Sequence, residues 1–196
     1  AALVRALRYQ TNPHFLFNTL NSLSSLVMSG RPDEAESMIL KLSTFFRSGL
    51  SLDPSADVTL AEEIALQRLY LDIEKVRFPR RLKVEIDIPK ELETARVPGL
   101  LLQPLVENAI KYGVSGSRDK VTLGITAAES GPGRFTIEIR NSAGTALSKR
   151  NGGKRPSLFD VAWLATRYRS EYGIGGVPPL VQRGVFPVLL GVGGRV

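Results

Sequence analysis

The chain contains no cysteine and a single histidine among its 196 residues. The absence of cysteine excludes disulfide bonds and thiolate chemistry, and it fits a reducing compartment. The single histidine, His14, excludes a metal cluster built on several imidazoles and any pair of cooperating histidines. If this side chain takes part in chemistry, it acts alone as a nucleophile, an acid or a base.

Long hydrophobic runs are missing as well. No stretch approaches the roughly 18 consecutive apolar residues that a membrane-spanning helix needs, and no signal-peptide pattern opens the chain. The hydrophobic fraction of 43% and the charged fraction of 23% are those of a globular protein that builds a core. A chain of 196 residues has room for one ordinary domain or two small ones.

The excess of basic residues does not gather into a nucleic-acid-binding surface. The formal net charge is +7, but Arg77 and Arg81 are interleaved with Glu74 and Glu85. The densest basic segment, residues 149–155, is a glycine-containing stretch without base-reading side chains. We therefore expect a mildly basic, solvated surface and no nucleic-acid partner.

The first fifty residues predict two helices joined by a short turn. Residues 3–28 form the first helix and residues 34–50 the second, with a turn at 30–33 in which Asp33 is the expected N-cap. The first helix carries an apolar seam at helical spacing: Leu16, Leu20, Leu23 and Val27. The second carries another: Ala35, Met38, Leu42, Phe45 and Phe46. Such helices form an antiparallel hairpin that buries little by itself, so residues 1–52 are expected to dimerise into a four-helix bundle.

Beyond a linker at residues 53–57, helix and strand patterns are mixed. Thr59 and Glu62 have the spacing of a capping box and predict a helix that ends near Val76. Pro98 is expected to open a strongly apolar helix that ends at Tyr112. Alternating or apolar segments predict strands at residues 82–88, 121–127, 135–140 and 186–192. The fold class is therefore α+β, with a helical hairpin at 1–52 and an α/β sandwich at 58–196.

His14 is expected to point away from the seam of its helix. At about 100° per residue, the four seam positions lie about 180–240° around the helix from His14. The imidazole would thus face solvent, where it can meet an incoming group. Pro13 precedes it and should loosen or kink the helix. Asn18 lies one turn further on and is placed to orient the ring, although an amide cannot carry off a proton.

Two segments resemble the phosphoacceptor and nucleotide boxes of the LytS-type sensor histidine kinases. They are Asn-Pro-His-Phe-Leu-Phe-Asn at 12–18 and Leu-Leu-Gln-Pro-Leu-Val-Glu-Asn-Ala-Ile-Lys-Tyr-Gly at 101–113. The resemblance implies a homodimer with a GHKL-type ATP-binding domain, in which His14 accepts a phosphoryl group from Mg-ATP. It also implies transfer to an aspartate on a response regulator receiver domain. The chain would be cytoplasmic, with the sensor and any membrane segment upstream of Ala1.

The second segment carries the expected nucleotide ligands. Asn108 and Lys111 are three residues apart and share a helix face, with Gln103 and Glu107 alongside. An amide oxygen can ligate Mg²⁺ while phosphates and waters fill its remaining positions, and an ammonium can hold phosphates. The resemblance implies that Asn108 binds Mg²⁺, Lys111 the phosphates, and that Tyr112 lies along the nucleotide. Glu107 joins His14 and Asn18 as a candidate catalytic residue.

The resemblance weakens after residue 141. Asn141 stands where the family has an adenine-reading side chain, and its amide oxygen can accept from the adenine amino group. The expected glycine-rich lid is represented by Gly153 alone, followed by Lys154, Arg155 and Pro156, which should block a close backbone approach to phosphate. Three explanations of the missing glycines are open. The lid is divergent but working, the nucleotide site is degenerate, or the tail of the chain is altered relative to the family.

Three other functions remain open from the sequence. A non-catalytic dimeric phosphotransfer or scaffold protein would keep the hairpin and His14 without binding ATP. A GHKL ATPase without a phosphohistidine is disfavoured by residues 12–18, and a nucleic-acid binder is the weakest interpretation. Glu74 and Arg77 are expected to form a surface ion pair worth only a few tenths of a kcal/mol and to lie outside the site.

Overall fold

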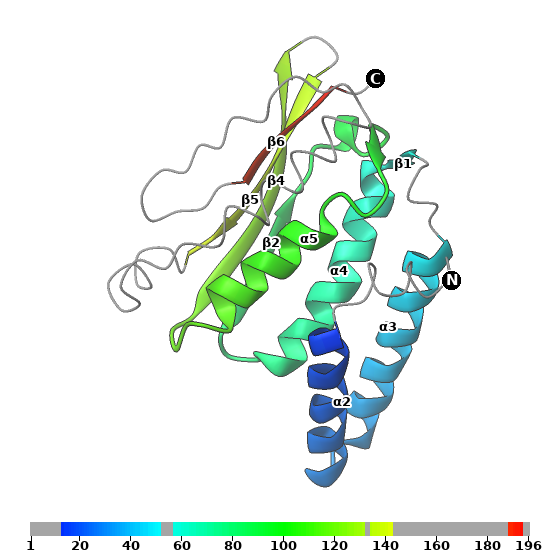
Figure 1. The fold of residues 1–196 in the computed structure, drawn as a ribbon, viewed down its shortest axis with the longest axis vertical. Helices are drawn as coiled ribbons and strands as arrows, with labels where there is room; N and C mark the ends of the chain where they lie inside the picture. The colour runs from blue at the N-terminus through cyan, green and yellow to red at the C-terminus, as the bar shows by residue number, and fades with distance from the viewer. Residues whose placement is uncertain (1–12, 52–56, 132–133, 143–187, 194–196) are drawn as a thin grey trace.

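A helical hairpin leads into a helix-covered sheet, which confirms the α+β fold class (Figure 1). The computed structural model describes residues 13–51, 57–131, 134–142 and 188–193. The hairpin consists of α2 (Pro13–Met28) and α3 (Pro32–Ser51). Both of its helices pack against α4 (Leu60–Arg77), which joins the hairpin to the rest of the fold. No helix of the described ranges combines the length and apolar character needed to cross a membrane.

The hairpin follows the predicted pattern with two differences at its ends. The second helix begins at Pro32, so Asp33 lies in its first turn and is not the N-cap. Proline suits this first position because the N–H that it lacks would have no partner inside the helix. Residues 3–12 of the predicted first helix lie outside the described residues, and so does the loosening expected ahead of Pro13.

The buried face of α2 is not the seam that the sequence predicts. Its buried side chains are Phe15, Thr19 and Leu26, which lie about 100–140° from His14 around the helix. Leu20 and Val27 of the predicted seam are 49% and 61% exposed. Within one chain, α2 packs against both α3 and α4 through a neighbouring face. The seam was expected to pack in the four-helix bundle of a dimer, so it stays a prediction. On α3 the prediction is confirmed, since Ala35, Met38 and Phe45 are buried.

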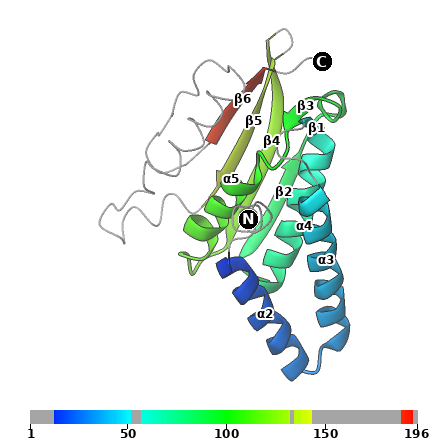
Figure 2. The same ribbon diagram turned by 45° about the vertical axis from the view of Figure 1, so that its right-hand side comes forward.

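The sheet has four strands in the order β2-β4-β5-β6. They are β2 (Leu82–Asp87), β4 (Val121–Gly131), β5 (Arg134–Asn141) and β6 (Val188–Gly193), and all four predicted strands are confirmed. The first pair is parallel and the other two are antiparallel. Helices α4 and α5 (Gln103–Asn108) cover one face of this sheet, as Figure 2 shows. The alternation along β4 and β5 points their apolar residues at this layer: Val121, Leu123, Ile125, Ala127, Phe135, Ile137 and Ile139.

The start of α4 is fixed by the predicted capping box. The Thr59 hydroxyl accepts from the Glu62 N–H at 3.2 Å, and the Glu62 carboxylate accepts from the Thr59 N–H at 2.8 Å. A two-stranded ladder joins β1 (Asp57–Thr59) to β3 (Arg96–Pro98) beside this cap. A short 3₁₀ helix, η1 (Lys90–Leu92), leads into β3. The ladder brings the N-terminal end of α4 next to the segment that enters α5.

The helix expected from Pro98 to Tyr112 begins later than predicted and changes from an α-helix to a π-helix along its length. Pro98 ends β3, a turn follows, and α5 starts only at Gln103. Leu100 in this turn has a φ of 61°, which interrupts helical geometry. After Asn108 the chain continues as the π-helix η2 (Ala109–Val114), in which the Ser115 N–H donates to the Ile110 carbonyl at 2.9 Å. Apolar content correctly predicted helix here, but it could not locate the turn or the wider helical geometry.

Candidate functional site

His14 lies exposed in the first turn of α2, the orientation that the sequence predicts. The Asn18 side-chain amide contacts the imidazole, with Nδ2 at 3.0 Å from Nδ1 and 3.2 Å from Nε2. Asn18 can do this because residues four apart in a helix lie on the same face. The next residue after the histidine, Phe15, is buried against the neighbouring helices. The helix is therefore fixed by Phe15 while His14 remains open to solvent.

The nucleotide-box residues are gathered on α5 and η2. Glu107 and Asn108 are half-buried, and Gln103 donates from Nε2 to Oε1 of Glu107 at 2.8 Å. Lys111 is exposed and holds its ammonium 4.9 Å from the ring centroid of Tyr112. Single π-helical turns inside helices are frequent at functional sites because they re-aim the side chains that follow. This set thus offers the amides of Gln103 and Asn108, the carboxylate of Glu107, one ammonium and one aromatic ring on neighbouring turns.

Asn141 comes to the same helix from the sheet. It occupies the last core-facing position of β5, and its side chain is 9% exposed. A Cβ atom on Gly113 would lie 2.9 Å from both Cγ and Nδ2 of Asn141. The absence of a side chain at Gly113 therefore lets Asn141 pack directly on η2. The fold places Asn141 against η2, the π-helix that carries Lys111 and Tyr112 and directly follows Asn108. Gly153 and the rest of the lid segment lie outside the described residues.

Glu63 positions the turn that precedes the nucleotide helix, a role that the sequence did not reveal. This carboxylate is completely buried and accepts from the backbone N–H groups of Leu100 at 2.9 Å and Leu102 at 2.7 Å. Burial raises its pKa to about 7, although the N–H groups of Leu102 and Leu100 and the side chain of Gln67 oppose the shift. A glutamate in the first turn of a helix is ordinarily a surface residue, so nothing in the local pattern marks this one.

Glu74 and Arg77 do not form the surface pair that the sequence predicts. The Glu74 side chain is 1% exposed, and Arg77 donates from Nη1 to both of its carboxylate oxygens at 2.7 Å. Burial raises the pKa of Glu74 most, Arg77 lowers it, and the nearby Glu107 carboxylate raises it further. The prediction was wrong because α4 is covered by the hairpin on one side and by the α5 layer on another, which leaves it little surface.

The donor set on α5 and η2 fits a magnesium-bound nucleotide. One side-chain amide, that of Asn108, is a hard oxygen donor of the kind that Mg²⁺ accepts. Magnesium keeps waters and phosphate oxygens in its remaining positions and does not need an all-protein cage. The Lys111 ammonium is exposed and able to meet phosphates, while the buried Asn141 amide lies against the backbone of Gly113. The residues present therefore match both the metal and the anion that accompany ATP.

Sequence comparisons with known proteins agree on one family. A family model described as histidine kinase matches residues 2–82. Sensor histidine kinase BtsS of Escherichia coli K12 is 41% identical over 172 residues, which cover 87% of this chain and 30% of BtsS. Sensor protein LytS of Bacillus subtilis is 37% identical over 124 residues, covering 62% of this chain and 21% of LytS. Among solved structures, the histidine kinase domain of the Erythrobacter litoralis EL346 protein gives a TM-score of 0.47 at 12% identity, covering 91% of this chain and 95% of that one.

The chain spans about 30% of the length of its relative BtsS. It belongs to the LytS-type sensor histidine kinases, the signal-transduction family of two-component systems.

Proposed function

We propose that this chain is the catalytic core of a sensor histidine kinase that phosphorylates its own His14 from Mg-ATP. The proposal rests chiefly on His14 itself, the only histidine of the chain, which is exposed and contacted by Asn18. From His14 the phosphoryl group would pass to an aspartate of a response regulator receiver domain. The two working parts are the phosphoacceptor hairpin, residues 1–52, and the nucleotide-binding part, residues 58–196.

The chemistry requires a ring nitrogen with a free electron pair. That nitrogen attacks the γ-phosphorus of ATP, a nitrogen–phosphorus bond forms, and the bond to the bridging oxygen breaks as ADP leaves. The amide of Asn18 can be turned by 180° so that Oδ1 takes the place of Nδ2 beside the ring. In that orientation Oδ1 can accept from whichever ring nitrogen carries the proton, and the other nitrogen supplies the attacking electron pair.

Asn108, Lys111, Tyr112 and Asn141 would hold the nucleotide. Magnesium, when bound, neutralises charge that develops on the phosphate oxygens. Asn108 would hold the metal, Lys111 would steady the phosphates as a point charge, and Tyr112 would lie along the nucleotide. Asn141 would read the adenine amino group, with Glu107 completing the catalytic set beside Asn108. Gly153 is the remaining candidate contact.

A calorimetric titration of Mg-ATP into the purified chain tests the nucleotide site. We expect saturable binding that the substitution Asn108→Ala abolishes or weakens at least about tenfold, since it removes a metal ligand. Incubation with γ-labelled Mg-ATP should then label the wild type at His14. Absence of binding up to millimolar nucleotide would instead favour the phosphotransfer or scaffold function.

A homodimer through the hairpin is the proposed assembly. Six large apolar side chains of α2 and α3 stay at least 49% exposed in the single chain: Phe17, Leu20, Val27, Met28, Ile39 and Leu40. Several large exposed apolar side chains on one hairpin mark an interaction surface. Pairing of two hairpins would cover it and form the four-helix bundle. We further propose that the core works in the cytoplasm, attached to a sensor and membrane segment upstream.

Removing the Asn18 amide should slow phosphorylation without affecting nucleotide binding. For Asn18→Ala we expect the rate of His14 phosphorylation at saturating Mg-ATP to fall about tenfold, since the amide no longer orients the ring. The calorimetric affinity for Mg-ATP should not change. Asn21→Ala, on the exposed side of the same helix, is the matched control. Unaltered phosphorylation in Asn18→Ala would show that the amide does not orient the ring.

Adding a methyl group at Gly113 should displace Asn141. Glycine to alanine ordinarily stabilises a helix by about 1 kcal/mol, but here the new Cβ would meet Asn141 at 2.9 Å. We expect Gly113→Ala to weaken Mg-ATP binding about tenfold, which is the loss expected when one contact, that of Asn141 with the nucleotide, is displaced. Gly124→Ala is the control, because its Cβ would have no neighbour within 4 Å. Equal affinities of Gly113→Ala and Gly124→Ala for Mg-ATP would show that Asn141 does not contribute to nucleotide binding.

A further inference from the structure

One carboxylate of α4 holds the segment that opens the nucleotide helix α5. Glu63 is completely buried, and its Oε2 accepts from the Leu100 N–H at 2.9 Å while its Oε1 accepts from the Leu102 N–H at 2.7 Å. Leu102 is the N-cap residue of α5, and no side-chain hydrogen bond caps the helix there. In a capping box, a glutamate accepts from the N–H of the N-cap residue of its own helix. Glu63 supplies this acceptor to α5 from another helix.

The neighbouring glutamate serves α4 itself. Glu62 accepts from the Thr59 N–H at 2.8 Å and completes the capping box of α4. Consecutive residues of a helix point about 100° apart, so Glu62 is exposed while Glu63 faces the turn that leads into α5. The two adjacent carboxylates therefore fix the beginnings of two different helices. Substituting one or the other separates the contribution of each helix.

The turn that Glu63 holds has a strained backbone. Leu100 has a φ of 61°, a conformation that residues with a side chain seldom adopt. Leu101 and Leu102 beside it are almost completely buried. Strained conformations of this kind persist only where the surrounding structure holds them in place. The two hydrogen bonds to Glu63 bracket the strained residue, one at its own N–H and one two residues later.

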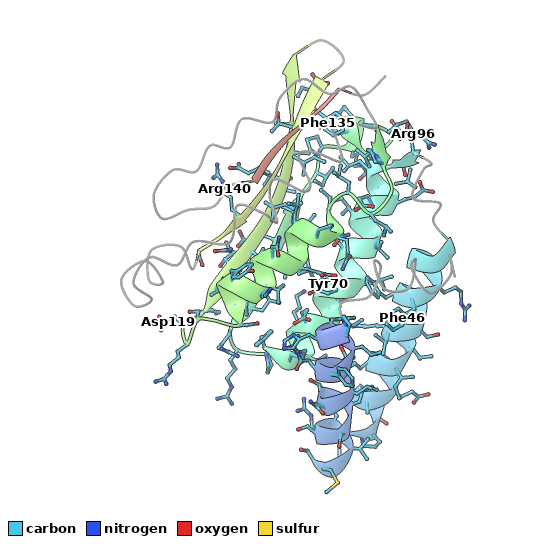
Figure 3. The ribbon with its side chains drawn as sticks, in the orientation of Figure 1. Phe46, Tyr70, Arg96, Asp119, Phe135 and Arg140 are labelled. Atoms are coloured by element: carbon cyan, nitrogen blue, oxygen red, sulfur yellow. The ribbon has the colours of Figure 1, made fainter. Side chains whose placement is uncertain are left out.

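The chain just before this turn is fixed to the beginning of α4. The β1–β3 ladder ends at Pro98, and the Arg96 Nη2 donates to the Asp57 carbonyl at 2.6 Å. Figure 3 shows Arg96 at the N-terminal end of α4. Beyond Pro98, Glu63 extends this attachment to the first turn of α5. Because α5 is a short helix of residues 103–108, its direction determines where the amide of Asn108 lies.

We propose that Glu63 is a positioning residue of the nucleotide site, whose carboxylate holds α5 in the arrangement that presents Asn108 to Mg-ATP. The inference rests on the proposed kinase function and adds a residue that acts through the helix, since a completely buried side chain does not reach the nucleotide. Without this carboxylate, only a fraction of the free molecules would hold α5 in place. The apparent dissociation constant would rise by the inverse of that fraction. Bound nucleotide would select the competent arrangement and restore the rate.

Glu63→Gln in the full chain, compared with Glu62→Gln, tests the proposal. Glutamine keeps the size of the side chain but replaces one acceptor oxygen with an NH₂ group, which cannot accept from Leu100 or Leu102. At about pH 8.5, where Glu63 with its pKa of about 7 is ionised, we expect the calorimetric dissociation constant for Mg-ATP to rise about tenfold. The rate of His14 phosphorylation at saturating Mg-ATP should stay within about threefold of the wild type. Glu62→Gln should change neither quantity more than about twofold.

Met38→Ala separates positioning from a general loss of stability. Met38 is completely buried on α3, so its truncation destabilises the fold at a site outside the layer that carries α5. At a temperature where thermal unfolding shows all variants to be folded, Met38→Ala should bind Mg-ATP within about twofold of the wild type. If Glu63→Gln does not fold, Glu63→Asp takes its place. It keeps the charge but withdraws the carboxylate by one methylene, and the same rise is expected.

A glycine at position 100 should partly compensate for the lost acceptor. Glycine adopts positive φ without strain, so Leu100→Gly combined with Glu63→Gln should recover at least about threefold of the lost affinity. No recovery, an unchanged dissociation constant in Glu63→Gln, or an equal loss in Met38→Ala would overturn the positioning role and leave the kinase function standing. A wild-type chain that binds no Mg-ATP would overturn the kinase function first, and this inference with it.

Discussion

Replacing His14 with glutamine should abolish phosphorylation of the chain. Glutamine keeps a polar side chain of similar length but has no nucleophilic nitrogen, so we expect the labelling rate to fall on the order of a thousandfold or more. The measurement is incorporation of γ-labelled phosphate under single-turnover conditions. The product in the wild type should be labile in acid and stable in base, as a nitrogen–phosphorus bond is.

Nucleotide binding is the internal control for this substitution. His14 lies on α2, whereas the candidate nucleotide ligands lie on α5, η2 and β5. His14→Gln should therefore bind Mg-ATP with wild-type affinity in a calorimetric titration. Persistent acid-labile labelling of His14→Gln would show that another residue accepts the phosphoryl group, which would contradict the proposed function. Steady ATP turnover without labelling would revive the ATPase alternative.

Removing the Glu63 carboxylate should cause the largest loss of stability. Glu63→Ala leaves the buried N–H groups of Leu100 and Leu102 without their acceptor. An unsatisfied buried donor costs about 1–3 kcal/mol, so the free energy of unfolding should fall by roughly 3–5 kcal/mol in a urea titration. Glu62→Ala is the control at the neighbouring position. It removes an exposed capping carboxylate and should lower the free energy of unfolding far less than Glu63→Ala.

The same carboxyl group predicts a pH dependence of stability. Its pKa is raised in the folded chain from an ordinary 4.5 to about 7, so the folded state binds its proton more tightly than the unfolded state. The stabilisation is complete below about pH 4.5 and is lost as the pH rises through about 7. Because a tenfold change in proton affinity corresponds to about 1.4 kcal/mol, the loss of stability is on the order of 3 kcal/mol.

Comparison with Glu63→Gln isolates this contribution from other titrating groups. The amide does not ionise, so the difference in unfolding free energy between wild type and Glu63→Gln should fall between about pH 5 and about pH 8. Urea titrations at the two pH values measure it directly. A difference that is the same at both would mean that burial does not raise the Glu63 pKa as described.

The sequence predicted elements well wherever a local pattern determines them. The capping box at Thr59, the strands of the sheet and the apolar face of α3 all rest on spacing within a single segment, and the structure confirms them. The exposure of His14 was predicted correctly, whereas the face of its helix that is buried within the single chain, with Phe15 and Thr19, was not foreseen beside the seam expected for the dimer. That face depends on α4, which lies more than thirty residues away and contributes no signal to the local pattern.

The missed residues share the same physical reason. Glu63, Tyr70 and Glu74 lie on α4 and are buried by segments distant in the sequence, among them the turn at residues 99–102 for Glu63 and the hairpin for Tyr70. The sequence pattern around a glutamate or tyrosine on an amphipathic helix is the same whether one face of the helix is buried or two faces are. The candidate nucleotide residues were easier to find because a contiguous motif contains most of them.

The pairing of β6 with β5 has a consequence for how the chain is made. Residues 134–139 bond to residues 188–193, so β5 is synthesised well before the strand that covers its outer edge. In the interval, the apolar strand with Phe135, Ile137 and Ile139 presents unpaired backbone groups that another copy can extend. A ribosome that pauses between the two strands would carry a nascent chain with an open edge, a form prone to aggregate. Slow translation of this region should therefore lower the soluble yield more than an equal delay within the hairpin.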